Sequence, residues 1–400
     1  MDVRQLGKML DVDKVVEGSV QKEGNRLRVS AQLVNTSDGY PVWSNTYDRN
    51  IQDVFAIEDD ISGAIAHSLS GVLTSKTSTT NIEAYQQYFE ARYLWNKRTP
   101  NDLMKAIEHF RRTTALDPNY APAYVGIADS LTLLASYEFG IMKPVEAIPQ
   151  ARTAAMKALA IDERLPEAHV SLATILYQFE WNWEGAEKEF KRAVDLNPSY
   201  ATGRQWYGEF LSARGRFDES LREIESAEVL DPLSLIIHTA HGRVLYLSRN
   251  YDLAIQKYQQ AISLEPNFLL AHAGLGFAYA QKSMYDAALA EFHKAIDISG
   301  RAPVLLGSLG FAEGLSGHRA EALKLLQELK ETSNRAYVMP VYEAAVHLGL
   351  DDRDQAITAI EQAYLQKSDF ITFLGVEPAV DKLRSDPRFK NLLSRANIQK

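Results

Sequence analysis

The chain has 400 residues, 46% of them apolar, which is ample material for a hydrophobic core. Its net charge of -9 argues against nucleic acid or an anionic membrane as the main partner, because both favour clustered Lys and Arg. The lack of cysteine excludes disulfides, thiolate catalysis and cysteine-ligated metals.

No stretch of the sequence is apolar over the about 18 residues that a membrane helix needs. The opening residues MDVRQLGKML are too polar for a secretory signal. We therefore expect a cytoplasmic protein by default, or a periplasmic one if a membrane segment precedes this sequence.

Residues 1–75 have the pattern of a small α/β unit. Strict alternation in RLRVSAQLVN predicts a half-buried strand. DKVVEGSVQ is a second predicted strand, joined to the first by a hairpin with Gly24 in its turn, and VWSNTYD is a third. The apolar strand face is formed by Leu27, Val29, Ala31 and Leu33. A helix against this antiparallel sheet is predicted by the spacing of Val54, Ile57, Ile61, Ile65 and Leu69.

A repeat array is expected from 84 to 364, after a polar linker at 76–83. Its period is clearest at Pro198, Pro232 and Pro266, which follow one another at an interval of 34 residues. Small residues recur at the same interval at Gly208, Gly242 and Gly276. A period of this length with a terminal Pro is the tetratricopeptide signature.

Each repeat is expected to be a pair of antiparallel helices in which small residues face large ones, and the Pro ends the second helix. The further repeated positions are Ser220, Ala254 and Ala288; Ile224, Tyr258 and Phe292; and Ala227, Ala261 and Ala295. The predicted fold class is mostly α, a right-handed α-solenoid of about eight helix pairs, preceded by a small incomplete α/β domain. Residues 365–400 break the period and are expected to cap the array.

One segment closely resembles the small α/β domain named after the TolB amino-terminal region: VDKVVEGSVQKEGNRLRVSAQLVNTSDGYPVWSNTYDRNIQDVFAIEDDIS. In bacterial signalling proteins that domain commonly precedes tetratricopeptide arrays, behind a winged-helix, protein-kinase or nucleotide-cyclase output module. The resemblance implies that the chain is the regulatory part of such a protein. Because the sequence begins at the helix before the VVEGSV strand, the first strand and helix of the full domain are absent, and an exposed sheet edge is expected.

The inner surface of the superhelix is the expected binding surface, because such arrays hold a peptide or partner helix there. Aromatic residues with scattered Arg and Glu are typical of a groove, and burial by neighbouring helices is the alternative, above all for Tyr177 and Phe311. Arrays that grip chaperone tails use Lys and Asn where this chain has Gln205 and Glu209, so that mode is not expected. The predicted groove residues are Tyr85, Tyr88, Arg92, Trp95, Asp129, Tyr177, Gln205, Glu209, Arg243, Tyr246, Phe277, Gln281 and Phe311.

No motif predicts catalysis, a cofactor or a metal site. GLGFAYA at 274–280 resembles a dinucleotide loop, but it belongs to the first helix of a repeat rather than following a strand. His238 and His241 could share a metal, yet a packed pair is favoured because the sequence offers no third ligand nearby. The solvated face of an amphipathic helix explains the acidic cluster of Glu58, Asp59 and Asp60.

The leading hypothesis is a non-enzymatic scaffold that binds a protein or peptide in the groove, as the sensory or regulatory half of a bacterial signalling protein. A cell-envelope assembly factor is the second hypothesis, and an enzyme with a cryptic site is the third. An oligomer is compatible with each of them.

Overall fold

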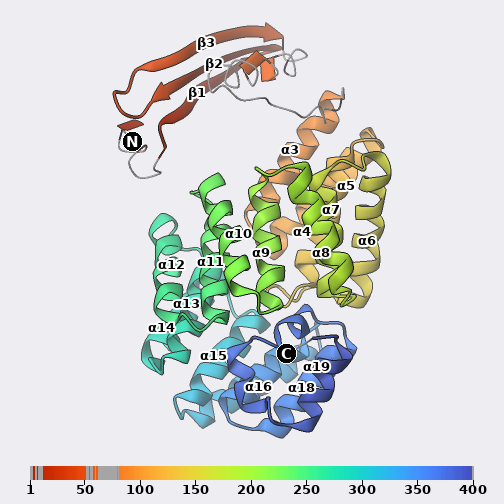
Figure 1. Cartoon of the computed structure of the whole chain (residues 1–400), viewed down its shortest axis with the longest axis vertical. Helices are drawn as coiled ribbons and strands as arrows, with labels where there is room; N and C mark the ends of the chain where they lie inside the picture. The colour runs from red at the N-terminus through yellow and green to blue at the C-terminus, as the bar shows by residue number, and fades with distance from the viewer. Residues whose placement is uncertain are drawn as a thin grey trace. The chain divides into compact units, whose positions relative to one another are not determined.

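The computed structural model describes residues 3, 4, 7, 12–50, 54, 57, 58, 60, 61, 79 and 81–398. The chain forms two compact units, Met1–Glu83 and Ala84–Lys400. The first unit is a small sheet with helical residues packed against it, and the second is an array of helices (Figure 1).

The sheet of the first unit is antiparallel, with strand order β1-β2-β3, as the alternation of its residues predicts. A two-residue turn joins the first two strands, and Gly24 takes the left-handed conformation there (φ +58°) that hairpin turns of this length require. A register shift at Leu33/Val34 marks an irregularity opposite the third strand. The strands are β1 (Lys14–Glu23), β2 (Arg26–Asn35) and β3 (Pro41–Asn50).

One face of this sheet carries a small core. Leu27, Tyr47 and Ile57 are buried there, and the partly buried Val54 and Ile61 pack against them, which confirms helical residues against the sheet. Most of β1 is exposed along the sheet edge. The rest of the predicted helix, with Ile65 and Leu69, lies outside the described residues, as do Asp59 and most of the predicted linker.

The second unit contains eight antiparallel helix pairs, which confirms the predicted repeat architecture. The pairs follow one another in an arc from α3/α4 to α13/α14, and the carboxyl-terminal elements return beneath the middle of the array in Figure 1. The pairs are α3 (Ile82–Asn96) and α4 (Pro100–Leu116); α5 (Ala121–Ala135) and α6 (Pro144–Ile161); α7 (Pro166–Gln178) and α8 (Trp183–Leu196); α9 (Ala201–Ala213) and α10 (Phe217–Leu230); α11 (Leu235–Leu247) and α12 (Tyr251–Leu264); α13 (Leu269–Gln281) and α14 (Tyr285–Ser299); α15 (Pro303–Leu315) and α16 (Arg319–Ser333); α17 (Pro340–Gly349) and α18 (Arg353–Leu365).

The small repeated residues lie where paired helices approach most closely. A Cβ atom added to Gly242 would stand 2.8 Å from the ring of Tyr258, and one added to Gly276 would stand 2.8 Å from the ring of Phe292. These are the bulky repeated positions of the same pairs, so the predicted register is confirmed. The GLGFAYA stretch accordingly lies within helix α13 and packs, as the repeat pattern predicts.

The turns between paired helices repeat with the same period. In the third to the eighth pair, one residue of each turn takes a left-handed backbone conformation, with φ between +55° and +87°. Glycine, which adopts this conformation without steric cost, stands at only some of these positions. From the third pair to the eighth the residues are Trp181, Gly215, Arg249, Ser283, Gly317 and Asp351.

The array closes on itself through two irregular segments. The loop between α5 and α6 reaches α17, where the Tyr342 hydroxyl donates a hydrogen bond to the Tyr137 carbonyl oxygen (2.8 Å). After α18 the chain forms two 3-10 helices, η2 (Asp369–Phe373) and η3 (Pro378–Leu383), and then α19 (Pro387–Arg395). Within the described part of the chain, no helix is both long and apolar enough to cross a membrane.

Candidate functional site: the inner hollow of the array

The first helices of the pairs surround a hollow with a volume of about 250 Å³. Helices α5, α7, α9, α11, α13, α15 and α17 all contribute to its wall, together with the α5–α6 loop, η2 and η3. Residues that lie far apart in the sequence, such as Arg98 and Glu377, therefore line the same hollow.

Seven of the thirteen predicted groove residues line this hollow: Tyr177, Gln205, Glu209, Arg243, Tyr246, Phe277 and Phe311. Tyr177 and Phe311 are only 1% and 3% exposed, so burial by neighbouring helices accounts for most of their surface. Gln281 lies just outside the lining and donates a long hydrogen bond to the Tyr246 hydroxyl (3.5 Å).

The other predicted groove residues belong to the amino-terminal end of the array. Tyr88 packs edge-on against Tyr120 (ring centroids 5.0 Å apart), and the Arg92 guanidinium lies over the buried Trp95 ring at 4.5 Å. Tyr85 is half-buried on the same helix.

Asp129, the next predicted groove residue, lies on helix α5 and is buried. Its carboxylate accepts a hydrogen bond from the Ser171 hydroxyl (2.5 Å), and burial raises its pKa to about 6. Whether any of the thirteen residues contacts a partner stays a prediction.

The wall of the hollow includes a group of aromatic side chains. The Phe277 ring lies 5.9 Å from Phe311 and 6.5 Å from Tyr246, in tilted arrangements that aromatic rings favour. Trp206, Tyr258 and Phe373 add to this wall.

Arg98 is a buried cation in the same wall. Its side chain is stacked on Trp95 (guanidinium 3.6 Å from the ring centroid), and its Nε atom has no hydrogen-bond partner. Burial lowers the pKa of Arg98 to about 10, although the charges of Asp129 and Glu138 favour its ionised form. No carboxylate of the described residues lies within ion-pair distance of it, so these charges act on the guanidinium without direct contact.

Four carboxyl groups face the hollow: those of Glu138, Glu209, Asp369 and Glu377. Burial raises the pKa of Glu209 to about 7, and the Glu138 charge adds to this effect. Burial likewise raises the pKa of Asp369 well above its ordinary value, although the Tyr137 N–H donates a hydrogen bond to its Oδ1 atom (2.8 Å). The walls therefore hold more acidic than basic groups.

Arg243 is the second cation of the hollow, and intramolecular contacts hold it in place. Its guanidinium lies 3.5 Å from a Glu138 carboxylate oxygen and 4.3 Å from the Phe373 ring centroid. Burial lowers the pKa of this group. Unlike Arg98, Arg243 has a carboxylate partner.

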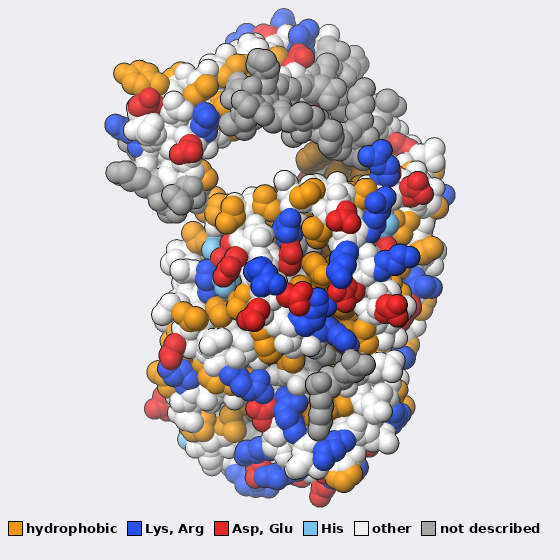
Figure 2. Space-filling model, in the orientation of Figure 1, with side chains coloured by type: hydrophobic (Ala, Val, Ile, Leu, Met, Phe, Trp, Pro, Cys, Tyr) orange, Lys and Arg blue, Asp and Glu red, His pale blue; other side chains and the backbone are white. Residues whose placement is uncertain are grey.

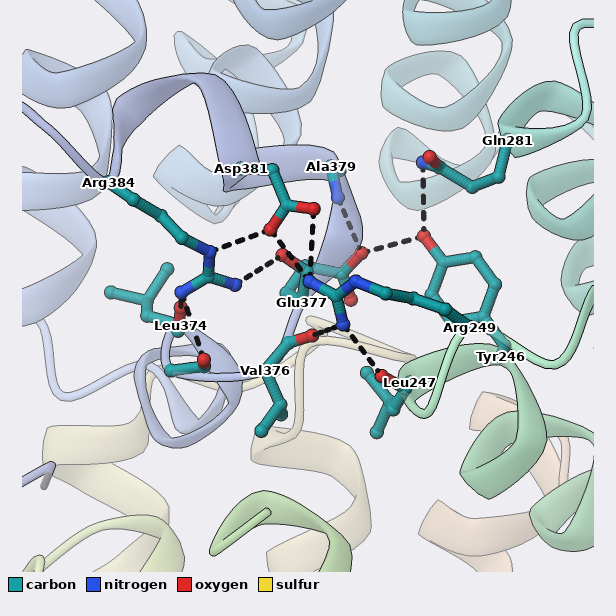
Figure 3. A network of polar contacts seen from close by, with 11 residues as sticks. Tyr246, Leu247, Arg249, Gln281, Leu374, Val376, Glu377, Ala379, Asp381 and Arg384 are labelled. Atoms are coloured by element: carbon teal, nitrogen blue, oxygen red, sulfur yellow. Dashed lines mark hydrogen bonds and ion pairs between the residues drawn. The ribbon is translucent and has the colours of Figure 1, made fainter. Parts of the chain in front are cut away.

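The carboxyl-terminal segment contacts residues of the predicted inner binding surface (Figure 3). The Tyr246 hydroxyl donates a hydrogen bond to Glu377 Oε1 (2.6 Å). Arg249 donates to the Val376 carbonyl oxygen (3.2 Å) and forms a two-pronged ion pair with Asp381 (2.8 and 3.0 Å).

The expected inner binding surface is therefore partly covered by the chain's own carboxyl-terminal segment. Residues after α18 do more than cover the last pair, because η2 lies against α7 and the Trp183 indole donates to the Ala396 carbonyl oxygen (3.2 Å). Inner aromatic and charged positions look the same in sequence whether they bind another protein or the chain's own end. The physical reason for the difference is tertiary closure, which brings residues more than 120 positions apart into contact.

Sequence reasoning missed several residues of the hollow, and a signal for some of them was present. Arg249 stands at the repeated turn position that holds Gly215 and Gly317 in other pairs, and Arg98 also has a left-handed backbone (φ +53°). A large side chain at such a turn projects from the end of the pair, which marks it as a contact residue. Asp369 and Glu377 carry no comparable signal.

His238 and His241 surround a carboxylate rather than a metal. His238 Nδ1 lies 3.0 Å from Glu228 Oε1, and His241 Nδ1 lies 3.1 Å from Oε2 in an oblique orientation. Lys257 donates to both oxygens of the same carboxylate (2.9 and 2.8 Å). The two histidines therefore pack around Glu228. Among the positions that the structure describes, no group of three His, Cys, Asp or Glu residues could hold a metal ion.

The His238 arrangement recurs along the array. His238 Nε2 lies 2.9 Å from the carbonyl oxygen of Pro232, six residues earlier, and His272 Nε2 lies 2.9 Å from that of Pro266. Arg204 holds the same repeat position and donates to the Pro198 carbonyl oxygen (2.7 Å). A basic side chain here ties the start of a pair to the preceding turn.

The sequence profile described as "TPR repeat" matches residues 242–283. A protein of Rhizobium meliloti (strain 1021) named "Putative adenylate cyclase 3" is 30% identical over 186 residues, 44% of this chain. The chain spans 31% of the length of that relative.

Among solved structures, a monomeric mutant of IFIT1 with Gppp-AAAA superposes with a TM-score of 0.55 at 16% identity, over 87% of this chain and 82% of that one. A human IFIT1 dimer with PPP-AAAA gives a TM-score of 0.50 at 17% identity, over 86% and 77% of the two chains. At this identity the likeness shows the fold alone. Taken with the eight helix pairs and their confirmed register, these matches show that residues 242–283 carry the tetratricopeptide pattern and that the array has a tetratricopeptide-like solenoid fold.

Proposed function

We propose that the chain is a non-catalytic interaction scaffold and the regulatory part of a larger bacterial signalling protein. Tetratricopeptide arrays present an inner surface to protein or peptide partners, and the relative with a cyclase name extends well beyond the matched portion. The resemblance of the amino-terminal segment to the TolB-like domain implies an upstream output module. Partner binding would regulate this module.

The partner surface that we infer is the amino-terminal end of the inner face, at α3 and α5. The observation that carries it is Arg92, which is half-buried and stacks on Trp95 but forms no ion pair among the residues described. The contacts that hold the carboxyl-terminal segment involve Tyr246, Arg249 and Trp183 instead. A partner with a carboxylate and apolar side chains would match Arg92 and Tyr88.

The charged residues of the hollow disfavour phosphate-rich ligands such as the Gppp-AAAA and PPP-AAAA named with the IFIT1 structures. Four acidic side chains and two arginines line it, so a phosphate-rich ligand would meet only two basic side chains there. On the face of the array seen in Figure 2, basic and acidic side chains are interspersed rather than gathered by sign.

The test compares the partners that the full chain retains in a pull-down with those of Arg92→Glu. Arg192→Glu is the matched control, since Arg192 is exposed on the outer helix α8. We expect Arg92→Glu to lose a partner that both wild type and the control retain, with unchanged circular dichroism. Identical partner sets for all three proteins would refute the assigned surface.

A further inference from the structure

We propose that the inner hollow binds a small zwitterion, an α-amino acid with an apolar side chain, whose carboxylate contacts Arg98 and whose ammonium group contacts Glu209. This small-molecule site goes beyond the interaction surface at α3 and α5, and it would make the array a sensor of a metabolite as well as a scaffold.

The size of the hollow fits such a ligand. Its volume is about 250 Å³. An apolar protein cavity of about 150 Å³ already admits benzene, whereas pockets for drug-sized ligands begin at about 300 Å³. The space therefore suits a single amino acid better than a peptide segment or a helix.

One basic and one acidic side chain in the wall, Arg98 and Glu209, have no oppositely charged partner among the described residues. Arg98 is 7% exposed, and its guanidinium has a ring contact with Trp95 but no ion pair or side-chain hydrogen bond within the described chain. Glu209 Oε1 accepts a hydrogen bond from Gln205 Nε2 (3.0 Å), and none of the described basic residues lies within ion-pair distance of this carboxylate. Arg98 and Glu209 do not touch, yet each influences the pKa of the other.

A zwitterion placed between them would compensate both charges at once. A guanidinium binds a carboxylate through paired N–H donors, and a carboxylate binds an ammonium group through charge-assisted hydrogen bonds. A ligand with one charge would compensate one group and leave the other buried and unpaired, which is unfavourable.

The remaining wall supplies the apolar contact. Phe277, Phe311 and Trp206 present rings to the hollow, and such surfaces bind the side chain of an apolar or aromatic amino acid. Phe373 and Asp369 of the carboxyl-terminal segment also line it, so an occupant would contact that segment.

The affinity should depend on pH. Burial raises the pKa of Glu209 to about 7, with Glu138 acting in the same direction and Gln205 and Arg98 opposing it. Because an ammonium ligand requires the ionised carboxylate, binding near neutral pH would release a proton, and affinity would fall below about pH 6.

Calorimetric titration of the full chain tests the site with matched probes. L-phenylalanine and L-leucine carry both charges, 2-phenylethylamine carries the ammonium group alone, and 3-phenylpropionate carries the carboxylate alone. We expect at least one amino acid to bind at least about tenfold more tightly than both singly charged compounds. In L-amino-acid titrations, two buffers with different ionisation enthalpies should reveal the released proton.

Two substitutions separate the charges. Glu209→Gln should weaken binding of the amino acid and of 2-phenylethylamine by about tenfold or more and leave binding of 3-phenylpropionate unaffected. Arg98→Met should weaken binding of the amino acid and of 3-phenylpropionate by a similar factor and leave binding of 2-phenylethylamine unaffected. Glu225→Gln, an exposed acid on α10, is the matched control and should change nothing. Hydrogen exchange of 369–383 should slow when the amino acid is bound.

No heat with either amino acid at about 10 mM would overturn the proposal. Equal affinity for the zwitterions and the singly charged probes, or equal effects of Glu209→Gln and Glu225→Gln, would also overturn it. If Arg98→Met fails to fold, Glu209→Gln decides the outcome. Loss of amino-acid binding with retained partner capture would distinguish failure of this site from failure of the scaffold.

Discussion

Glu228 contacts three basic side chains of the next helix pair, and replacing it with Gln should destabilise the middle of the array. The carboxylate lies on α10, whereas His238 and His241 lie on α11 and Lys257 on α12. The Glu228 and His238 side chains are 16% and 13% exposed, so solvent screens their interaction little.

The size of the effect follows from the number of charged contacts. A hydrogen bond that involves a charged group contributes about 1.5–3 kcal/mol to stability, and Gln keeps one acceptor oxygen but loses the charge. We therefore expect Glu228→Gln to lower the free energy of unfolding by about 2–4 kcal/mol. An exposed ion pair such as Lys324–Glu321 contributes about 0–1 kcal/mol, so Glu321→Gln is the control.

The loss should depend on pH with a definite sign. Burial alone would raise the pKa of Glu228, but the hydrogen bonds from His238 and Lys257, together with the nearby His241 ring, outweigh it and bring this pKa well below 4.5. The hydrogen bond to Glu228 raises the pKa of His238 above 6.5, against the opposing effect of desolvation. The Glu228 contribution is thus present above pH 4.5 and lost as pH falls, and the His238 contribution is present below pH 6.5 and lost as pH rises.

The assay is urea unfolding of wild type, Glu228→Gln and Glu321→Gln, followed by circular dichroism at about pH 5.5 and about pH 8.5. Because repeat arrays need not unfold in one step, hydrogen exchange of α10, α11 and α12 gives the local value. The difference between wild type and Glu228→Gln should be larger at the lower pH. The same small difference at both pH values, no greater than that of Glu321→Gln, would refute the buried network.

Three further predictions concern the closure, the repeat register and the hollow. Tyr246→Phe removes a donor from the buried Glu377, so we expect a loss of about 1–2 kcal/mol and faster hydrogen exchange in Pro378–Leu383; unchanged exchange would contradict the contact. Gly242→Leu overfills the contact with Tyr258 and should cost about 1–3 kcal/mol in urea unfolding, whereas Gln256→Leu on the exposed face of α12 should cost little; equal midpoints would contradict the register. Glu209→Gln should stabilise the chain by about 1–3 kcal/mol at about pH 8 and little at about pH 4. Burial raises the pKa of Glu209 from 4.5 to about 7, so the free-energy cost of ionising this buried carboxyl grows as pH rises through that interval. A variant that is less stable than wild type at about pH 8 would count against the burial of this carboxyl.

The helix pairs and the sheet could be read from local pattern. Gly242 and Tyr258 stand at fixed places in the 34-residue period, and their contact depends only on residues within one pair. The alternation around Leu27 likewise selects the buried face of β2, because neighbouring side chains of a strand point to opposite faces. The seven predicted groove residues that line the hollow lie on first helices, and the same periodicity indicated them.

The contents of the hollow depended on contacts between distant parts of the chain. Nothing local in the sequence indicates that Glu377 meets Tyr246 or that Asp381 meets Arg249, since each pair is separated by more than 120 residues. Periodicity specifies which side of a helix faces inward, because that choice is made within 34 residues. It does not specify how far the superhelix closes, because the degree of closure depends on the accumulated small rotations between successive pairs. An irregular loop and a carboxyl-terminal segment, neither of which follows the repeat period, then complete the closure.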